Sequence, residues 1–269
     1  MQDENPKIGI STAFDYSIPL KRSLPLIKQA GFDIISIGGQ QEHSGYLTSQ
    51  GKENILNLVN ENQLKIDSIH APFRGEGDIS SVNEIVRKEG IKLTQSTIDA
   101  CFQLGADIII LHLSYDQVTQ LERRKKNVLE SMRILLPYAF EKKVKIAVEN
   151  LTEKGSQIVL EAVLDEFDND HLGLCFDTSH ANLDHNPFEI LERYKERLIA
   201  THISDNQGEA DDHLLPFEGK INWESFKKLI RNINYQGIFL IESVTEFSEI
   251  KEPELFLKEA KKRIEKILK

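Results

Sequence analysis

Six apolar segments of the sequence end in a side chain that can bind a metal ion or carry a proton. The clearest example is Leu172–His180, in which β-forming residues stop at Asp177 and His180 follows three positions later. Taken alone, an aspartate in this place fits equally well as the cap of a helix or turn. Repetition of the pattern favours a functional site. The other five segments end at His70, His112, Glu149, His202 and Glu242.

These residues have the composition of a divalent metal site. A buried charge is costly unless it is paired or binds a metal ion, so a shared cation would explain why so many occur. Three carboxylates and one imidazole suit Mn²⁺, Mg²⁺ or Co²⁺. That set is Glu149, Asp177, His202 and Glu242. Further ligands, for substrate or for additional zinc ions, are His70, His112, His180, Asp211 and His213.

Strand patterns alternate with helical patterns along the whole chain. The predicted strands are Lys7–Ser11, Phe32–Ile37, Ile66–His70, Asp107–His112, Val144–Glu149, Leu172–Asp177, Leu198–His202 and Gly237–Glu242. The helical patterns cover residues 19–30, 54–59, 81–104, 121–140, 158–164, 187–197, 223–230 and 253–268. Eight such units without a linker predict an α/β fold, one (β/α)₈ TIM barrel domain over residues 1–269. A doubly wound sheet is the alternative.

A barrel of this kind would bring the strand-end residues together. Catalytic groups of TIM barrels come from the C-terminal ends of several strands. Because side chains alternate along a strand, the residue two positions before each ligand also points inward. These inward positions hold small or apolar residues, which suits a packed interior below a polar mouth. They are Ser68, Ile110, Ala147, Cys175, Ala200 and Leu240.

Composition narrows the class of protein. With 269 residues, of which 40% are hydrophobic, the chain can bury a sizeable core. A formal net charge of −10 disfavours general electrostatic binding of nucleic acid, although a metal-filled cleft could still bind phosphate. Two cysteines, Cys101 and Cys175, are too few for a disulfide framework. Without a secretory signal or an apolar run of about 20 residues, a soluble cytoplasmic protein is expected.

Several motifs together resemble the xylose isomerase-like barrels, specifically the sugar phosphate isomerase/epimerase families and their relatives of the endonuclease IV type. The similarity extends over nearly the whole chain, and the order and spacing of the motifs carry it. The motifs are Ile66–Phe73, Leu104–Ala106, Leu111–His112, Val148–Asn150, Phe176–His180, His202–Asn206, Asp211–His213, Glu218–Gly219 and Leu240–Ser243.

The resemblance implies a metal-dependent isomerase or epimerase of a ketose-type sugar. The metal ligands would be Glu149, Asp177, His202 and Glu242, and His180 would contact substrate. Glu149 and Glu242 would be the catalytic bases on opposite faces of the sugar, one removing a proton and the other returning it through a metal-stabilised cis-enediolate. Two bases give epimerisation, whereas transfer between adjacent carbons gives isomerisation.

Two positions depart from the ketose 3-epimerases of the tagatose/psicose type. Those enzymes carry a second Glu six residues after the strand-five Glu and an Arg six after the strand-seven His, where this chain has Gly155 and Gly208. A phosphorylated sugar, an inositol-derived ketone or another polyol therefore stays open as substrate. Lys154 and Arg74 are candidate phosphate contacts.

Two other functions remain open. Endonuclease IV-like enzymes use three zinc ions to cleave abasic DNA, and all nine of their ligand positions have counterparts here. The counterparts are His70, His112, Glu149, Asp177, His180, His202, Asp211, His213 and Glu242. The acidic composition and the absence of a basic or aromatic wedge loop argue against nucleic acid as partner. A non-catalytic sugar-binding barrel is the third alternative, but it would need no pair of opposed bases.

The expected partner is thus a small-molecule sugar. No association with a membrane is expected, and a homo-oligomer stays an open possibility.

Trp223 is expected to pack against a helix rather than to stack on a ligand.

Overall fold

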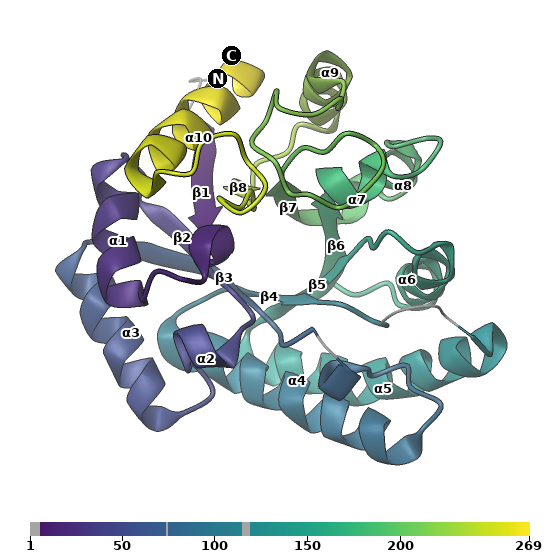
Figure 1. The fold of residues 1–269 in the computed structure, drawn as a ribbon. Coiled ribbons are helices and arrows are strands. Elements are labelled where there is room, and N and C mark those ends of the chain that lie inside the picture. The colour runs from purple at the N-terminus through teal and green to yellow at the C-terminus, as the bar shows by residue number, and fades with distance from the viewer. Residues whose placement is uncertain (1–5, 74, 115–118) are drawn as a thin grey trace.

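The computed structural model describes residues 6–73, 75–114 and 119–269, and within them eight parallel strands close into a barrel in chain order (Figure 1). β8 pairs with β1 and completes the ring. The predicted TIM barrel is therefore confirmed, and the doubly wound sheet is excluded. The strands are β1 Lys7–Ser11, β2 Ile34–Ile37, β3 Lys65–His70, β4 Ile108–Leu111, β5 Lys145–Glu149, β6 Leu172–Asp177, β7 Leu198–Ile203 and β8 Ile238–Ile241.

Helices surround the barrel and cover the strands on the outside (Figure 1). The α-helices are α1 Leu20–Gln29, α2 Gln41–Ser44, α3 Ser49–Glu61, α4 Glu84–Leu104, α5 Leu121–Lys142, α6 Lys154–Glu166, α7 Thr178–Asn182, α8 Glu189–Arg193, α9 Trp223–Ile233 and α10 Pro253–Leu268. Short 3₁₀ turns are η1 Thr12–Asp15, η2 Gly75–Gly77 and η3 Lys195–Arg197. In the part of the chain described, none of these helices has both the length and the apolar character needed to cross a membrane.

Several predicted helices differ in extent, and two differences are instructive. The helix expected over 187–197 is divided: α8 ends at Arg193, and the separate turn η3 begins at Lys195. Tyr194 interrupts the helix because it leaves helical backbone geometry while its hydroxyl donates to Asp165 of α6. In contrast, α6 begins four residues before the predicted apolar run at Ile158, since its first turn is polar.

The core has an inner and an outer layer. Inside the barrel, Ile110, Ala147, Cys175 and Ala200 form a small buried cluster of their own, here called the inner cluster. The outer layer, between strands and helices, includes Ile69, Val148 and Phe176. This alternation confirms the predicted inward and outward phases of the strands. The inner cluster therefore packs beneath the C-terminal ends of the strands, and its mostly small side chains do not fill the space at the mouth.

β6 sets the position of the mouth residues. All six of its residues are buried, and its register aligns Cys175 with Glu149 of β5 and Asp177 with His202 of β7. Because parallel neighbours lie about 4.8 Å apart, this register places the ends of three strands within reach of one cation.

Candidate metal and catalytic site

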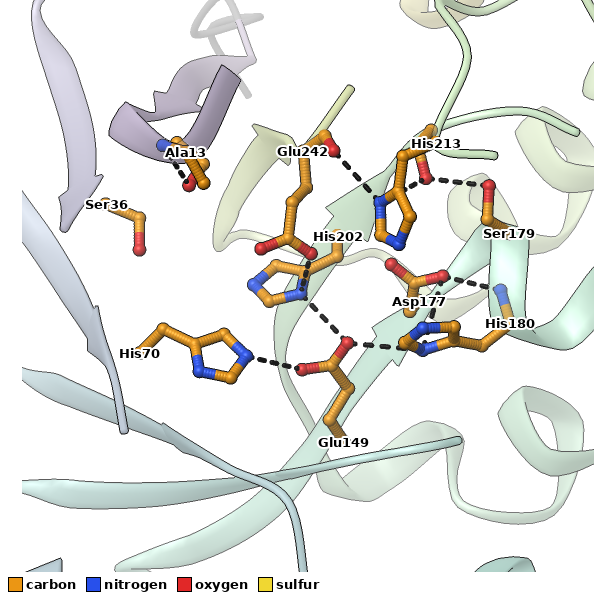
Figure 2. Close-up of polar contacts among 12 residues, drawn as sticks. Ala13, Ser36, His70, Glu149, Asp177, Ser179, His180, His202, His213 and Glu242 are labelled. Carbon is orange, nitrogen blue, oxygen red and sulfur yellow. Dashed lines mark hydrogen bonds and ion pairs between the residues drawn. The ribbon is translucent and has the colours of Figure 1, made fainter. Parts of the chain in front are cut away.

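Glu149 lies at the barrel mouth, where four histidines surround its carboxylate; Figure 2 shows three of them, His70, His180 and His202. Its Oε2 lies 3.4 Å from Nε2 of His70 and 3.1 Å from Nε2 of His112. Its Oε1 lies 3.3 Å from Nδ1 of His180 and 3.2 Å from Nδ1 of His202. Residues that are far apart in sequence thus meet at one carboxylate.

All nine residues singled out from the sequence fall into three adjoining groups of possible metal ligands. Within each group, one ligand atom from each residue lies within 4.8 Å of the others. The central group is Glu149, Asp177, His202 and Glu242. The His70 group is His70, His112 and Glu149. The His213 group is His180, Asp211 and His213.

The central group has the chemistry of a cation site. Glu149 Oε1, Asp177 Oδ2 and both ring nitrogens of His202 are buried without a hydrogen-bond partner in the described part of the chain. His202 Nδ1 lies only 2.7 Å from Glu242 Oε2, yet without hydrogen-bond geometry. Leaving buried polar atoms unsatisfied is costly, and a divalent ion among them would remove that cost. The residues present therefore fit a metal ion.

The ionisable side chains at the mouth shift one another's pKa values. Burial opposes ionisation of Glu149, but the charge of His202 and contacts with His112 and His180 hold its pKa well below the usual range. Burial raises the pKa of Asp177 to about 6. Burial opposes charging of His202 as well, but Cys175, Glu242 and Glu149 nevertheless raise its pKa well above the usual value. A cation binding here would displace protons from the histidines.

The two carboxylate oxygens of Asp177 lie in different environments. Oδ1 accepts a 2.7 Å hydrogen bond from the backbone N–H of His180 and caps α7, which has Asp177 as its N-cap. Oδ2 has no hydrogen-bond partner among the described residues. The sequence left a capping residue and a metal ligand as alternatives, and the geometry permits both at once.

Asn150 and Asp205 position the site, and the sequence analysis assigned neither a role. Asn150, directly after Glu149, contacts the backbone of Asp177 and, through its carbonyl, Nδ1 of His180 at 2.9 Å. Asp205 accepts hydrogen bonds from the backbone of Phe217 and Ile221 and from Trp223 Nε1. Asp205 thereby secures the β7–α9 loop that carries His213. Trp223 is buried and packs as predicted.

A cavity of about 300 Å³ opens above these groups. Tyr16, Phe73 and Val244 form its apolar wall, while Glu149, Glu242 and four of the histidines supply polar groups. No lysine or arginine lines it in the ranges that the structure describes. Lys154 begins α6 and lies outside the lining, and Arg74 falls outside the described residues.

Comparison with known proteins places the chain in the xylose isomerase-like TIM barrel family, whose family model matches residues 24–266. The uncharacterized protein y4fM of Sinorhizobium fredii is 31% identical over 82% of this chain and 80% of that protein.

Relatives with named activities are more distant. Fructoselysine 3-epimerase of Shigella flexneri is 23% identical, covering 97% of this chain and 98% of the relative. A probable endonuclease 4 of Carboxydothermus hydrogenoformans is 22% identical, covering 80% and 82%. Among solved structures, a D-tagatose 3-epimerase-like protein superposes with a TM-score of 0.81 at 26% identity, covering 97% and 98% of the two chains.

Proposed function

We propose that this protein is a divalent-metal-dependent isomerase or epimerase of a ketose-type sugar. The observation that carries the proposal is that Glu149 and Glu242 face one cavity and belong to one ligand group. Relatives named as sugar 3-epimerases support the same reaction class. The cavity size also suits a small-molecule substrate.

Glu149, Asp177, His202 and Glu242 would hold the ion, with Mn²⁺, Mg²⁺ or Co²⁺ suited to this set. When bound, the ion would stabilise negative charge on neighbouring oxygens of the sugar. One glutamate takes the proton from the carbon beside the carbonyl, and the other returns a proton to the enediolate. Return to the opposite face inverts the carbon and gives an epimer.

The remaining histidines orient the sugar. His70, His112 and His180 line the cavity and can hydrogen-bond to hydroxyl groups. Tyr16 and Phe73 form an apolar wall that restricts water near the reacting carbon. Each of these residues binds or positions substrate, while proton transfer belongs to Glu149 and Glu242.

Two positions argue for a substrate other than that of the tagatose/psicose 3-epimerases. Gly155 lies in the first turn of α6, and Gly208 lies in the β7–α9 loop at a positive φ of 79°. Neither offers a side chain to a sugar. Because the described lining also lacks lysine and arginine, an unphosphorylated sugar or polyol ketone fits this cavity better than a sugar phosphate.

Hydrogen exchange between substrate and solvent tests this function. The protein loaded with Mn²⁺ is incubated in D₂O with a panel of ketoses and inositol-derived ketones, and deuterium incorporation is followed by NMR. Glu149→Gln and Glu242→Gln should each lower exchange at least about 100-fold, since each removes a general base. Glu246→Gln changes an exposed glutamate near the mouth and should leave exchange intact. Wild-type exchange in either active-site variant contradicts the two-base mechanism, and tight binding without exchange favours a sugar-binding barrel.

A zinc-dependent phosphodiesterase acting on abasic DNA is the second candidate. The observation that favours it is the set of three adjoining ligand groups, two of which share Glu149. The lack of lysine and arginine in the described lining argues against it, because these side chains make many of the phosphate contacts in protein–DNA complexes. Elemental analysis separates the two: about one ion per chain supports the epimerase, whereas about three zinc ions with cleavage of an abasic duplex supports the nuclease.

A further inference from the structure

A buried thiol lies directly beneath the central group. Cys175 is on β6, fully buried, and aligned in register with Glu149 of β5. Its Sγ, a carboxylate oxygen of Glu149 and a ring nitrogen of His202 all lie within 4.8 Å of one another. The proposed reaction gives this thiol no role.

His202 offers more ligand atoms than the central group can use. Both of its ring nitrogens are buried without a hydrogen-bond partner among the described residues, and the side chain is 1% exposed. The two nitrogens of an imidazole point in different directions, so an ion at the central group can take only one of them. Glu149 Oε1 is also buried without a partner in the same part of the chain.

We propose that Glu149, Cys175 and His202 form a second cation position, one layer below the central group, that takes a thiophilic divalent ion such as Cd²⁺ or Zn²⁺. Thiolate and imidazole are ligands that soft and borderline ions prefer, whereas Mn²⁺ and Mg²⁺ prefer oxygen. Zinc binds sulfur at about 2.3 Å and nitrogen at about 2.0 Å, so the three ligand atoms, which lie within 4.8 Å of one another, would close around the ion. The thiol proton leaves to solvent as the metal–sulfur bond forms.

The two positions compete for Glu149. Its carboxylate belongs to both ligand sets, so an ion held by Cys175 draws it away from the central group, although His202 could offer each ion a different ring nitrogen. The other inner-cluster residues, Ile110, Ala147 and Ala200, have no side-chain atom that can bind a metal ion. The second cation position therefore has Glu149, Cys175 and His202 as its ligands. A thiophilic ion bound there therefore competes with the hard ion needed at the mouth.

Cadmium titration with ultraviolet absorbance tests the proposal on the full chain. A bound Cd²⁺ gives a thiolate-to-metal charge-transfer band only if a cysteine is a ligand. Cys101 provides the matched control, because it is equally buried but lies on α4 and its Sγ is 3.6 Å from the carbonyl of Ile108. Wild type and Cys101→Ser should develop the band with about one equivalent of Cd²⁺, and Cys175→Ser should not. Excess Mn²⁺ should suppress it.

Absence of the band in Cys101→Ser overturns the proposal, whether or not cadmium has bound elsewhere. Retention of the band in Cys175→Ser overturns it as well. Since Cys101→Ser leaves Cys175 as the chain's remaining cysteine, its spectrum answers the question even if Cys175→Ser does not fold. The readout requires no sugar turnover, so it stands apart from the test of the proposed epimerase.

Discussion

Asn150 and Asp177 are joined by two reciprocal hydrogen bonds. The backbone N–H of Asp177 donates to Asn150 Oδ1 at 2.8 Å, and Asn150 Nδ2 donates to the Asp177 carbonyl at 3.0 Å. Both residues are buried. One amide therefore ties the end of β5 to the end of β6 at the point where two proposed metal ligands must keep their spacing.

Asn150→Ala should destabilise the protein and weaken metal binding together. The change leaves a buried N–H and a buried carbonyl of Asp177 unpaired, at about 1 to 3 kcal/mol each. Thermal unfolding and Mn²⁺ titration measure the two effects. Asn57→Ala, at an exposed position of α3, is the control and should change neither. Unchanged metal affinity in Asn150→Ala would show that the amide does not position the ligands.

Asp205→Ala should loosen the β7–α9 loop while sparing the central group. Its carboxylate is fully buried and accepts hydrogen bonds from Asn206, Phe217, Ile221 and Trp223. We expect a loss on the order of 3 kcal/mol in unfolding free energy. Trp223 is the chain's single tryptophan, so its fluorescence reports the change directly. Equal loss of metal from the central group would contradict this division, and exposed Glu224→Gln serves as the control.

Metal affinity of the His213 group should increase with pH. Burial opposes charging of His213, but Asp211, 3.2 Å away, raises its pKa to about 9. A cation must displace that proton, so binding strengthens as pH rises toward 9. Zinc titrations at pH 6, 7, 8 and 9 with a competing chelator measure the trend. A pH-independent affinity at His180, Asp211 and His213 would refute it.

Asp67→Asn should stabilise the protein at alkaline pH. Burial raises the pKa of Asp67 to about 6, from an ordinary value of 3.8. The folded state therefore holds this proton more tightly than the unfolded state. Stability present below pH 4 is lost as pH rises through 6. We expect a gain of about 1 to 2 kcal/mol at pH 8 that shrinks toward pH 4.

Denaturant unfolding at both pH values measures this gain. Asp168→Asn, which alters an exposed carboxylate, should have little effect at either pH. An equal gain from Asp67→Asn at pH 4 and pH 8 would rule out ionisation as its cause.

The strand ends were predictable because their signal is local. The end of an apolar run at a polar side chain, as at Asp177, marks the end of a strand in the structure as well. The period-two alternation correctly predicted that Cys175 and Ala200 lie inside the barrel. The barrel topology followed from the number of repeated units. The catalytic and ligand roles assigned to the nine mouth residues remain proposals.

Other features depend on contacts between distant segments. Asn150 is an ordinary strand-end residue until β6 is packed beside it, although its place directly after Glu149 was a usable signal. Asp205 meets its partners only after the loop turns back on itself. The helix break at Tyr194 likewise depends on Asp165 of a neighbouring helix, which no local pattern reveals.

The hydrogen bonds to Asp205 have a consequence for association with a ligand. Donors and acceptor all belong to this chain, so the β7–α9 loop that carries His213 is ordered before any ligand binds. Binding of a ligand then costs little conformational entropy of the loop. The affinity therefore depends mainly on the contacts between ligand and protein. A preorganised loop of this kind favours rapid association without a slow conformational change.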